Sequence, residues 1–247
     1  MVSRFVCERS EDEERNDVDT RSETARETAL HSLRHARGRY AAERAAQLSG
    51  IPVSTIYDWN RHSIYVPDYR HGKPMAWSYR DLVYLRVLAW LRSEGTPRPD
   101  AAQWVSELKK HISAGHDVSE LRADRRTFAP DGDVTAPLGG TPVLFADMLG
   151  RFDLAGAAVE EFGSKTLWGP DLVTPTAHTY ISPWVLGGDP CIDETRIPTA
   201  AVFKLREERG LGIADVIELY PDLNEAEVEE AHELERRLHG LEAAAAA

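Results

Sequence analysis

Apolar residues recur at helical spacing along most of the chain after residue 39, and this pattern predicts a mainly α-helical protein. Turn and cap residues separate the helical stretches from one another. In the first half we expect helices over Ala41–Ser49, Val53–Asn60, Tyr79–Ser93 and Ala101–Ile112. In the second half we expect three more, over Thr199–Glu208, Ile213–Tyr220 and Glu225–His239.

The first two expected helices are spaced like a helix-turn-helix. Ala46 is small enough to let the two helices approach, and Gly50 suits a left-handed helix end. Ile56 and Trp59 then fall on the inward side of the second helix, and together with Ile51 in the turn they would lock that helix in place. Their order predicts that the second helix is held against the first with its other face in solvent.

A short β-hairpin and a long helix are expected next. Residues 63–67 have the pattern of a strand, a turn with Gly and Pro follows, and Met75–Trp77 has the pattern of a return strand. Ser78 is a suitable N-cap for the long helix, with Asp81 at the capping-box position. Helix-turn-helix, two-stranded wing and long helix, in this order, resemble the winged DNA-binding heads of MerR-like regulators.

This resemblance implies that the second helix enters the major groove and that the wing contacts phosphates. The residues it assigns to DNA are Ser54, Thr55, Tyr57, Arg61 and His62 on the helix, with Arg70 and Lys73 in the wing. Asp58 lies among them, and its carboxylate would repel phosphate unless it faces a cytosine amino group or a neighbouring arginine.

Charge is unevenly distributed along the chain, whose net charge is −12. Residues 30–112 hold 13 Lys and Arg against 7 Asp and Glu, a balance of +6. Residues 189–237 hold 14 acids against 6 bases, a balance of −8, and residues 8–27 hold 9 acids against 4 Arg, a balance of −5. A basic block between acidic ends predicts two surfaces with different partners, of which only the basic one suits DNA.

Composition divides the chain into five segments. Residues 1–29 have almost nothing to bury and are expected to be a disordered acidic tail. Residues 30–112 form the winged helix-turn-helix domain, and residues 113–178 form a linker of mixed character. Residues 179–240 are expected to hold a short strand followed by a three-helix, homeodomain-like bundle for dimerisation or protein binding. Residues 241–247, with their five alanines, are typical of a cloning scar and tag.

A tight loop that leads into a helix precedes the bundle. Its sequence, Gly188-Asp189-Pro190-Cys191-Ile192-Asp193-Glu194-Thr195-Arg196-Ile197-Pro198, is followed by Tyr220-Pro221-Asp222-Leu223. Together they resemble a family of small bacterial helical domains of unassigned function, whose signature reads Gly-Asp-Pro-x-Ile-x-Gly-Thr-Arg-Ile-Pro. Glu194 stands where that family has Gly, a residue that favours positive φ. We expect Arg196 to pair with Asp189 or Asp193, because a partly buried arginine needs an anion.

No enzymatic motif is present: the chain has no phosphate-binding glycine loop, no metalloprotease motif and no nucleophile elbow. Cys7 and Cys191 are isolated, and His31 and His35 have no third ligand nearby, so we expect no metal and no cofactor. No apolar run is long enough to span a membrane, and no export signal is evident. We therefore expect a non-enzymatic protein of the cytoplasm.

A DNA-binding head that precedes this signature domain resembles the VapB-type antitoxins of bacterial toxin–antitoxin pairs, especially the long mycobacterial kind. The resemblance implies binding to a VapC toxin, a PIN-domain ribonuclease with an acidic active site, and dimeric binding to promoter DNA. Arginines outside the head are candidates to clamp those acids, and we single out Arg151, Arg236 and Arg237. The alternative is a stand-alone MerR-like regulator whose C-terminal part senses a ligand or dimerises.

Overall fold

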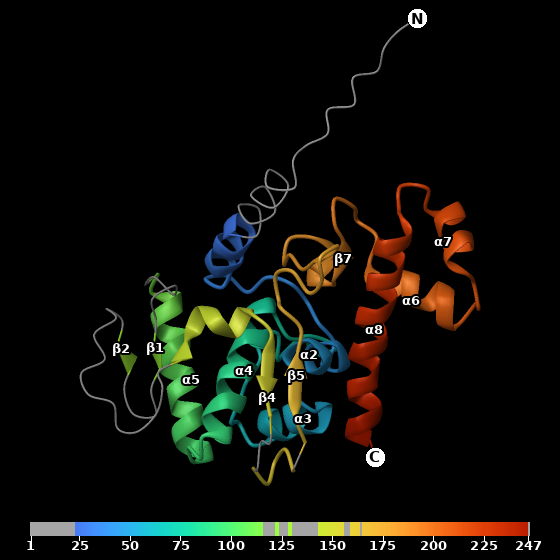
Figure 1. Cartoon of the computed structure of the whole chain (residues 1–247). Coiled ribbons are helices and arrows are strands. Elements are labelled where there is room, and N and C mark those ends of the chain that lie inside the picture. Colours follow the sequence, from blue (N-terminus) through green and yellow to red (C-terminus); the bar gives the residue numbers. More distant parts are fainter. Residues whose placement is uncertain are drawn as a thin grey trace, which may run out of the picture.

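The computed structural model describes residues 23–115, 122–123, 128–129, 143–155, 159–163 and 165–246. It is mainly helical, as the apolar spacing predicts (Figure 1). A helix over residues 23–32 comes first. The remaining α-helices are α2 (Ala42–Ser49), α3 (Val53–Arg61), α4 (Tyr79–Ser93), α5 (Arg98–Ser113), α6 (Thr199–Glu207), α7 (Ile213–Leu219) and α8 (Glu225–Ala246).

The strands are short and antiparallel. β1 (Arg122–Ala123) lies between β2 (Phe128–Ala129) and β3 (Val143–Leu144), and a 3₁₀ helix, η1 (Phe145–Leu149), follows β3. β4 (Phe152–Leu154) pairs with β5 (Leu167–Gly169), and β6 (Thr179–Tyr180) pairs with β7 (Cys191–Ile192). A second 3₁₀ turn, η2 (Leu186–Gly188), lies between β6 and β7.

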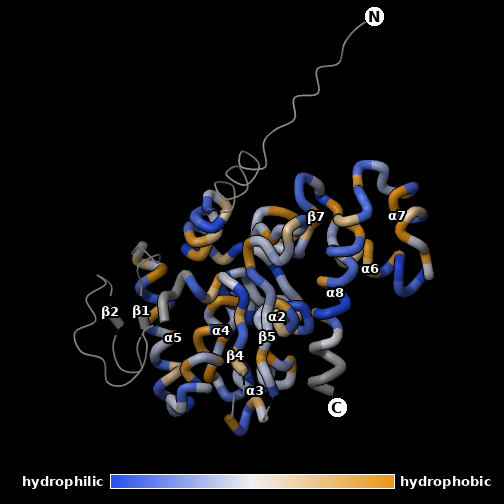
Figure 2. Tube along the Cα trace, in the orientation of Figure 1, coloured by the Kyte–Doolittle hydropathy of each residue, from blue (hydrophilic) through white to orange (hydrophobic). Residues whose placement is uncertain are grey.

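Two apolar cores hold these elements together. The larger core surrounds α4, which lies near the middle of Figure 1. Most side chains of this helix are buried. The smaller core lies between α6, α7 and the first half of α8, and it contains Val202, Val216 and Val228. Leu234 and Leu238, further along α8, are buried in the larger core. The same helix therefore takes part in both cores, and in Figure 2 the part of α8 beside its label is mostly blue, the colour of hydrophilic residues.

α4 begins at the predicted cap. The Ser78 hydroxyl accepts a hydrogen bond from the backbone N–H of Asp81, and the Asp81 carboxylate accepts one from the backbone N–H of Ser78. This capping box satisfies N–H groups that the first helical turn leaves unpaired. The predicted capping box of α8, between Asn224 and Glu227, is also present.

Arg86 on α4 is fully buried, and among the described residues it forms no ion pair with a carboxylate. Its guanidinium donates hydrogen bonds to four backbone carbonyls, those of Leu48, Met148, Gly150 and Pro170, at 2.6–3.0 Å. Those carbonyls lie at the end of α2, in and after η1, and after β5. The residue thus ties α4 to three segments that are far apart in the sequence.

Three local expectations differ from the structure. Residues 23–29 are helical rather than disordered, because Ala29 and Leu33 pack into the larger core at 4% and 0% exposure. The expected strand over residues 63–67 does not form. The expected strand over residues 179–186 is reduced to β6, since Pro183 follows closely and lacks a backbone donor. The first 22 residues of the expected tail lie outside the described residues, as do residues 116–121, 124–127, 130–142, 156–158 and 164 of the 113–178 segment.

Candidate nucleic-acid interface

The turn between α2 and α3 requires a glycine for two reasons. Gly50 has φ 77° and ψ 17°, a left-handed conformation, and its N–H donates to the carbonyl of Ala46. A Cβ atom on Gly50 would lie 2.5 Å from the carbonyl carbon of Trp168. The glycine therefore ends α2 and lets β5 approach the turn closely.

α3 presents one face to solvent and buries the other. Ile56 and Trp59 are 1% and 0% exposed, as the sequence predicts. The exposed residues are Ser54, Tyr57, Arg61 and His62. Tyr57 is 41% exposed, and its ring lies 6.1 Å from that of Trp77, edge to face.

Thr55 does not lie on the exposed face, so its assignment to a DNA-contacting surface is wrong. It is 6% exposed, and its hydroxyl donates to the carbonyl of Glu161 at 3.4 Å. The neighbouring Phe162 packs edge to face against Trp59, with ring centroids 6.0 Å apart. The segment before β5 covers this side of α3, and residues 113–178, expected to be linker, therefore contribute to the core.

An open hollow of about 750 Å³ runs along the exposed side of α3. Its lining combines α3 residues with Arg98 at the start of α5 and Glu161. Asp58, which would repel phosphate if it were free, contacts His62 at 3.0 Å and Arg98 at 3.7 Å. A neighbouring arginine therefore offsets its charge, which is one of the two arrangements that the sequence left open.

The loop after α3 takes the place of the expected two-stranded wing. It holds single bridges only, between Tyr69 and Ala76 and between Trp77 and Tyr40. Arg70 and Lys73 are exposed in this loop. The side chains of Arg61, Arg70 and Lys73 make no hydrogen bond or ion pair with any other described residue, so three cationic groups are available to a ligand.

Arg39 joins the same loop from the other side. Its guanidinium donates to the carbonyl of Pro74 at 3.4 Å and lies 5.7 Å from the centre of the Tyr69 ring. The Tyr69 hydroxyl in turn donates to the carbonyl of Ala36 at 2.7 Å. The sequence marks Arg39 only as part of a basic stretch before α2, and the contact with the loop depends on the fold.

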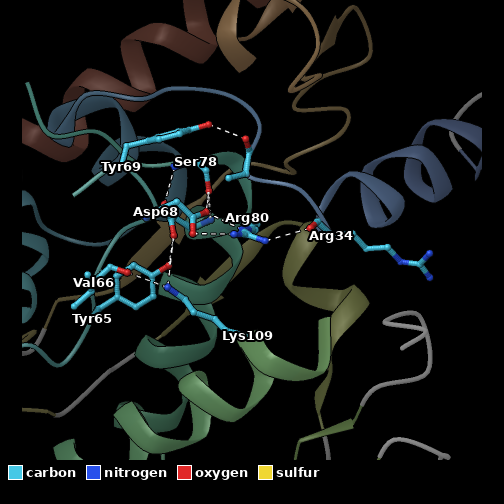
Figure 3. A network of polar contacts seen from close by, with 10 residues as sticks. Arg34, Tyr65, Val66, Asp68, Tyr69, Ser78, Arg80 and Lys109 are labelled. Carbon is cyan, nitrogen blue, oxygen red and sulfur yellow. Dashed lines mark hydrogen bonds and ion pairs between the residues drawn. The ribbon is translucent and has the colours of Figure 1, made fainter. Parts of the chain in front are cut away.

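A buried polar network holds the loop on α4 (Figure 3). Arg80 donates two hydrogen bonds to Asp68, at 2.7 and 2.9 Å. The carboxylate of Asp81 accepts hydrogen bonds from the Tyr65 hydroxyl and from the backbone N–H of Asp68. Lys109 of α5 lies 3.8 Å from Asp81 and donates to the carbonyl of Val66 at 2.9 Å.

Burial acts on Asp68, Asp81 and Lys109 of this network, with different outcomes for their pKa values. Burial and the neighbouring Asp68 raise the pKa of Asp81. Burial would also raise the pKa of Asp68, but the hydrogen bonds from Arg80 and Ser78 outweigh it and the pKa is lowered. Burial lowers the pKa of Lys109. The loop is therefore anchored mainly by the Asp68–Arg80 pair.

Each arginine selected as toxin-facing has a partner within the chain. Arg151 lies 3.5 Å from Asp153, and Arg236 donates to Glu233 at 2.9 Å. The guanidinium of Arg237 lies 3.7 Å from the centre of the Trp168 ring. Asp153 and Trp168 are opposite each other in the β4–β5 pair, so Arg151 and Arg237 flank one face of this hairpin.

The signature loop keeps its backbone turn despite the missing glycine. Glu194 has φ 55°, and the hydroxyl and N–H of Thr195 both donate to the carbonyl of Ile192. Arg196 is exposed, and its expected pair with Asp189 or Asp193 does not form. Asp189 bonds instead to Arg44 of α2 at 3.1 Å, and among the described residues no hydrogen bond or ion pair joins Arg196 to Asp193. The signature loop therefore contacts α2, which belongs to the head of the protein (residues 30–112).

No cluster of metal-binding side chains is present in the part of the chain that the structure describes. There, no three His, Cys, Asp or Glu side chains gather as metal ligands would. Cys191 is buried and unpaired, and burial raises its pKa to about 11. Within the same residues, no helix has the length and apolar character needed to cross a membrane.

The chain is similar to one protein family in its C-terminal part. The sequence model of a family described as a protein of unknown function, DUF433, matches residues 180–233. These residues include the signature loop, α6, α7 and the first part of α8. No curated protein and no solved structure matches the chain.

Proposed function

We propose that the protein is the antitoxin of a type II toxin–antitoxin pair. In this function it binds a VapC-type PIN-domain ribonuclease directly, and binds the promoter DNA of its own operon as a homodimer in the cytoplasm. It has no enzymatic activity and needs no cofactor. The proposal rests on the sequence resemblance together with the two chemically different surfaces of the molecule.

One observation carries the DNA-binding part of the proposal. α3 and the loop after it expose Arg61, Arg70 and Lys73, whose cationic groups have no partner among the described residues. The order of α2, Gly50, α3, the bridged loop and α4 supports a winged helix-turn-helix in which α3 enters the major groove. Ser54, Tyr57 and Arg61 would then face the bases or the flanking phosphates.

The C-terminal part of the chain has features that suit binding to a protein rather than to DNA. Here α6, α7 and the first half of α8 enclose the smaller core, which fits the proposed homeodomain-like three-helix bundle. Residues 189–237 carry a net charge of −8, from 14 acids and 6 bases, which opposes nucleic acid. Arg151, just before β4, and Arg237 of α8 flank the β4–β5 hairpin, and their guanidinium groups match the carboxylates of a PIN-domain active site.

Co-expression with the neighbouring toxin gene tests the antitoxin function. The purified toxin on its own should cleave RNA. It should lose that activity when this protein is added in an equimolar amount. Arg151→Ala with Arg237→Ala should weaken the inhibition, and Lys110→Ala, on the exposed face of α5, serves as a matched control. Full ribonuclease activity in an excess of this protein would refute the function.

A stand-alone MerR-like regulator is the second candidate. An open groove of about 460 Å³ favours it, since the groove lies between the helix over residues 23–32 and the segment 173–183 and is lined mainly by apolar groups. Such a groove suits an apolar effector. A promoter affinity that changes on addition of a small apolar ligand, with no PIN-domain gene next to this one, would favour the regulator over the antitoxin.

A further inference from the structure

A buried ion pair joins the head to the C-terminal part of the molecule. Arg44 on α2 donates two hydrogen bonds to Glu235 on α8, at 2.7 and 2.8 Å. A third goes to Asp189 of the signature loop, at 3.1 Å. The Glu235 side chain is 0% exposed and that of Arg44 14%, and the Thr199 hydroxyl at the start of α6 also donates to Glu235.

The backbone of the signature loop also contacts the head. The Tyr40 hydroxyl donates to the carbonyl of Gly188 at 2.9 Å, and the backbone N–H of Arg39 donates to the carbonyl of Gly187 at 2.8 Å. Gly188 has φ 96°, and a Cβ atom there would lie 2.6 Å from Cζ of Tyr40. Only glycine allows this approach, so the Gly-Asp pair of the signature has a direct role in the contact.

The chemistry of the junction is specific for arginine. A bidentate pair to one carboxylate plus a single bond to another uses the planar fork of a guanidinium, and an ammonium group cannot form all three bonds in one plane. Removing Arg44 would leave the fully buried carboxylate of Glu235 without its bidentate counter-charge, and this opposes separation of the two parts.

We propose that the signature loop and α8 form a docking site for an arginine-bearing helix, and that its occupant is α2 of this same chain. Arg44 is then a positioning residue: it fixes α2, and through the Gly50 turn α3, relative to the C-terminal domain. Neither Arg44 nor its carboxylate partners need to contact DNA for this role. The docking itself is independent of the proposed function, whereas its effect on DNA binding rests on that function.

Hydrogen–deuterium exchange on the full chain tests the docking without DNA. Arg44→Ala should raise exchange in residues 42–49 and also across the junction, in residues 186–190 and 232–239. Arg44→Lys should have a smaller effect, and Arg236→Ala, in an exposed ion pair on α8, should have none. Increased exchange confined to residues 42–49 would overturn the docking. If Arg44→Ala fails to fold, Asp189→Asn takes its place in the test. This variant alters the partner in the signature loop, at the more exposed edge of the junction, and should also raise exchange in α2.

Promoter binding tests the positioning role. Asp189→Asn and Glu235→Gln should weaken binding of the full chain to its own promoter DNA by about 2- to 30-fold, the range expected for coupling through a shared element. Unchanged affinity in both variants would overturn the positioning role. A wild-type chain that does not bind the promoter would instead refute the proposed function, and the exchange result would still decide the docking.

Discussion

Replacing Arg86 by methionine tests whether a buried cation that is bonded to four backbone carbonyls stabilises this fold. Methionine fills a similar volume without polar atoms, so the change removes four charge-assisted hydrogen bonds. At about 1.5–3 kcal/mol for each, the gross loss is about 6–12 kcal/mol. The variant no longer has to desolvate a guanidinium, which offsets several kcal/mol, and the net destabilisation is about 3–5 kcal/mol.

Thermal unfolding followed by circular dichroism measures this loss. For a protein of this size, about 3–5 kcal/mol corresponds to a decrease in Tm of about 6–20 °C. Arg236→Met is the matched control, since its side chain is 63% exposed and its partner Glu233 lies on the same helix. If Arg86→Met lowers Tm no more than this control does, the cost of burying the guanidinium cancels its four bonds and the reasoning fails.

Three further predictions address the turn, the loop and the exposed cations. Gly50→Ala should lower the free energy of unfolding by about 2–4 kcal/mol, because the alanine would combine positive φ with a clash against Trp168. A denaturant titration measures this loss, and a value below about 1 kcal/mol would show that β5 shifts away from the turn at Gly50. The pKa of Asp68 is lowered below its ordinary value of 3.8, so its ion pair stabilises the protein above that pH and this stability is lost as pH falls through the lowered value. Asp68→Asn should therefore have a lower Tm than the wild type at neutral pH, and the difference should shrink in acid; a constant difference would contradict this. Arg61→Ala with Lys73→Ala should reduce the slope of log K against log salt for promoter DNA by about 1.8, or about 0.9 for each lost phosphate contact, and an unchanged slope would remove both residues from the interface.

Local patterns predict the helices well, because helix propensity, caps and apolar spacing act within a few residues of one another. The end of α2 at Gly50, the capping box of α4 and the break after α7 at Pro221 are all of this kind. The expected strand over residues 63–67 fails for the complementary reason. A strand needs a partner along its length, and here the network around Asp68 and Asp81 holds the backbone in an irregular path instead.

The same distinction explains which parts of the candidate site could be found. Exposure of Tyr57 and Arg61 follows from their positions relative to Ile56 and Trp59 on a single helix. Burial of Thr55 does not, because the segment that covers it comes about 100 residues later and was expected to be linker.

The partner of Asp189 shows most clearly what the sequence leaves open. Asp189 lies between a glycine and a proline in a tight loop, and Arg196, seven positions later, is an obvious local candidate for its ion-pair partner. The rule that a charged side chain pairs with a counter-charge is satisfied equally by Arg196 and by Arg44. The choice is decided by α8, which places Glu235 beside Arg44, and the same guanidinium then also donates to Asp189 and to Gln47. Since Glu235 lies just past the residues matched to the family, the acidic residue that completes the junction belongs to the part of α8 that also packs into the larger core. The junction therefore needs both the signature loop, which contributes Asp189 and the carbonyl of Gly188, and the part of α8 that carries Glu235.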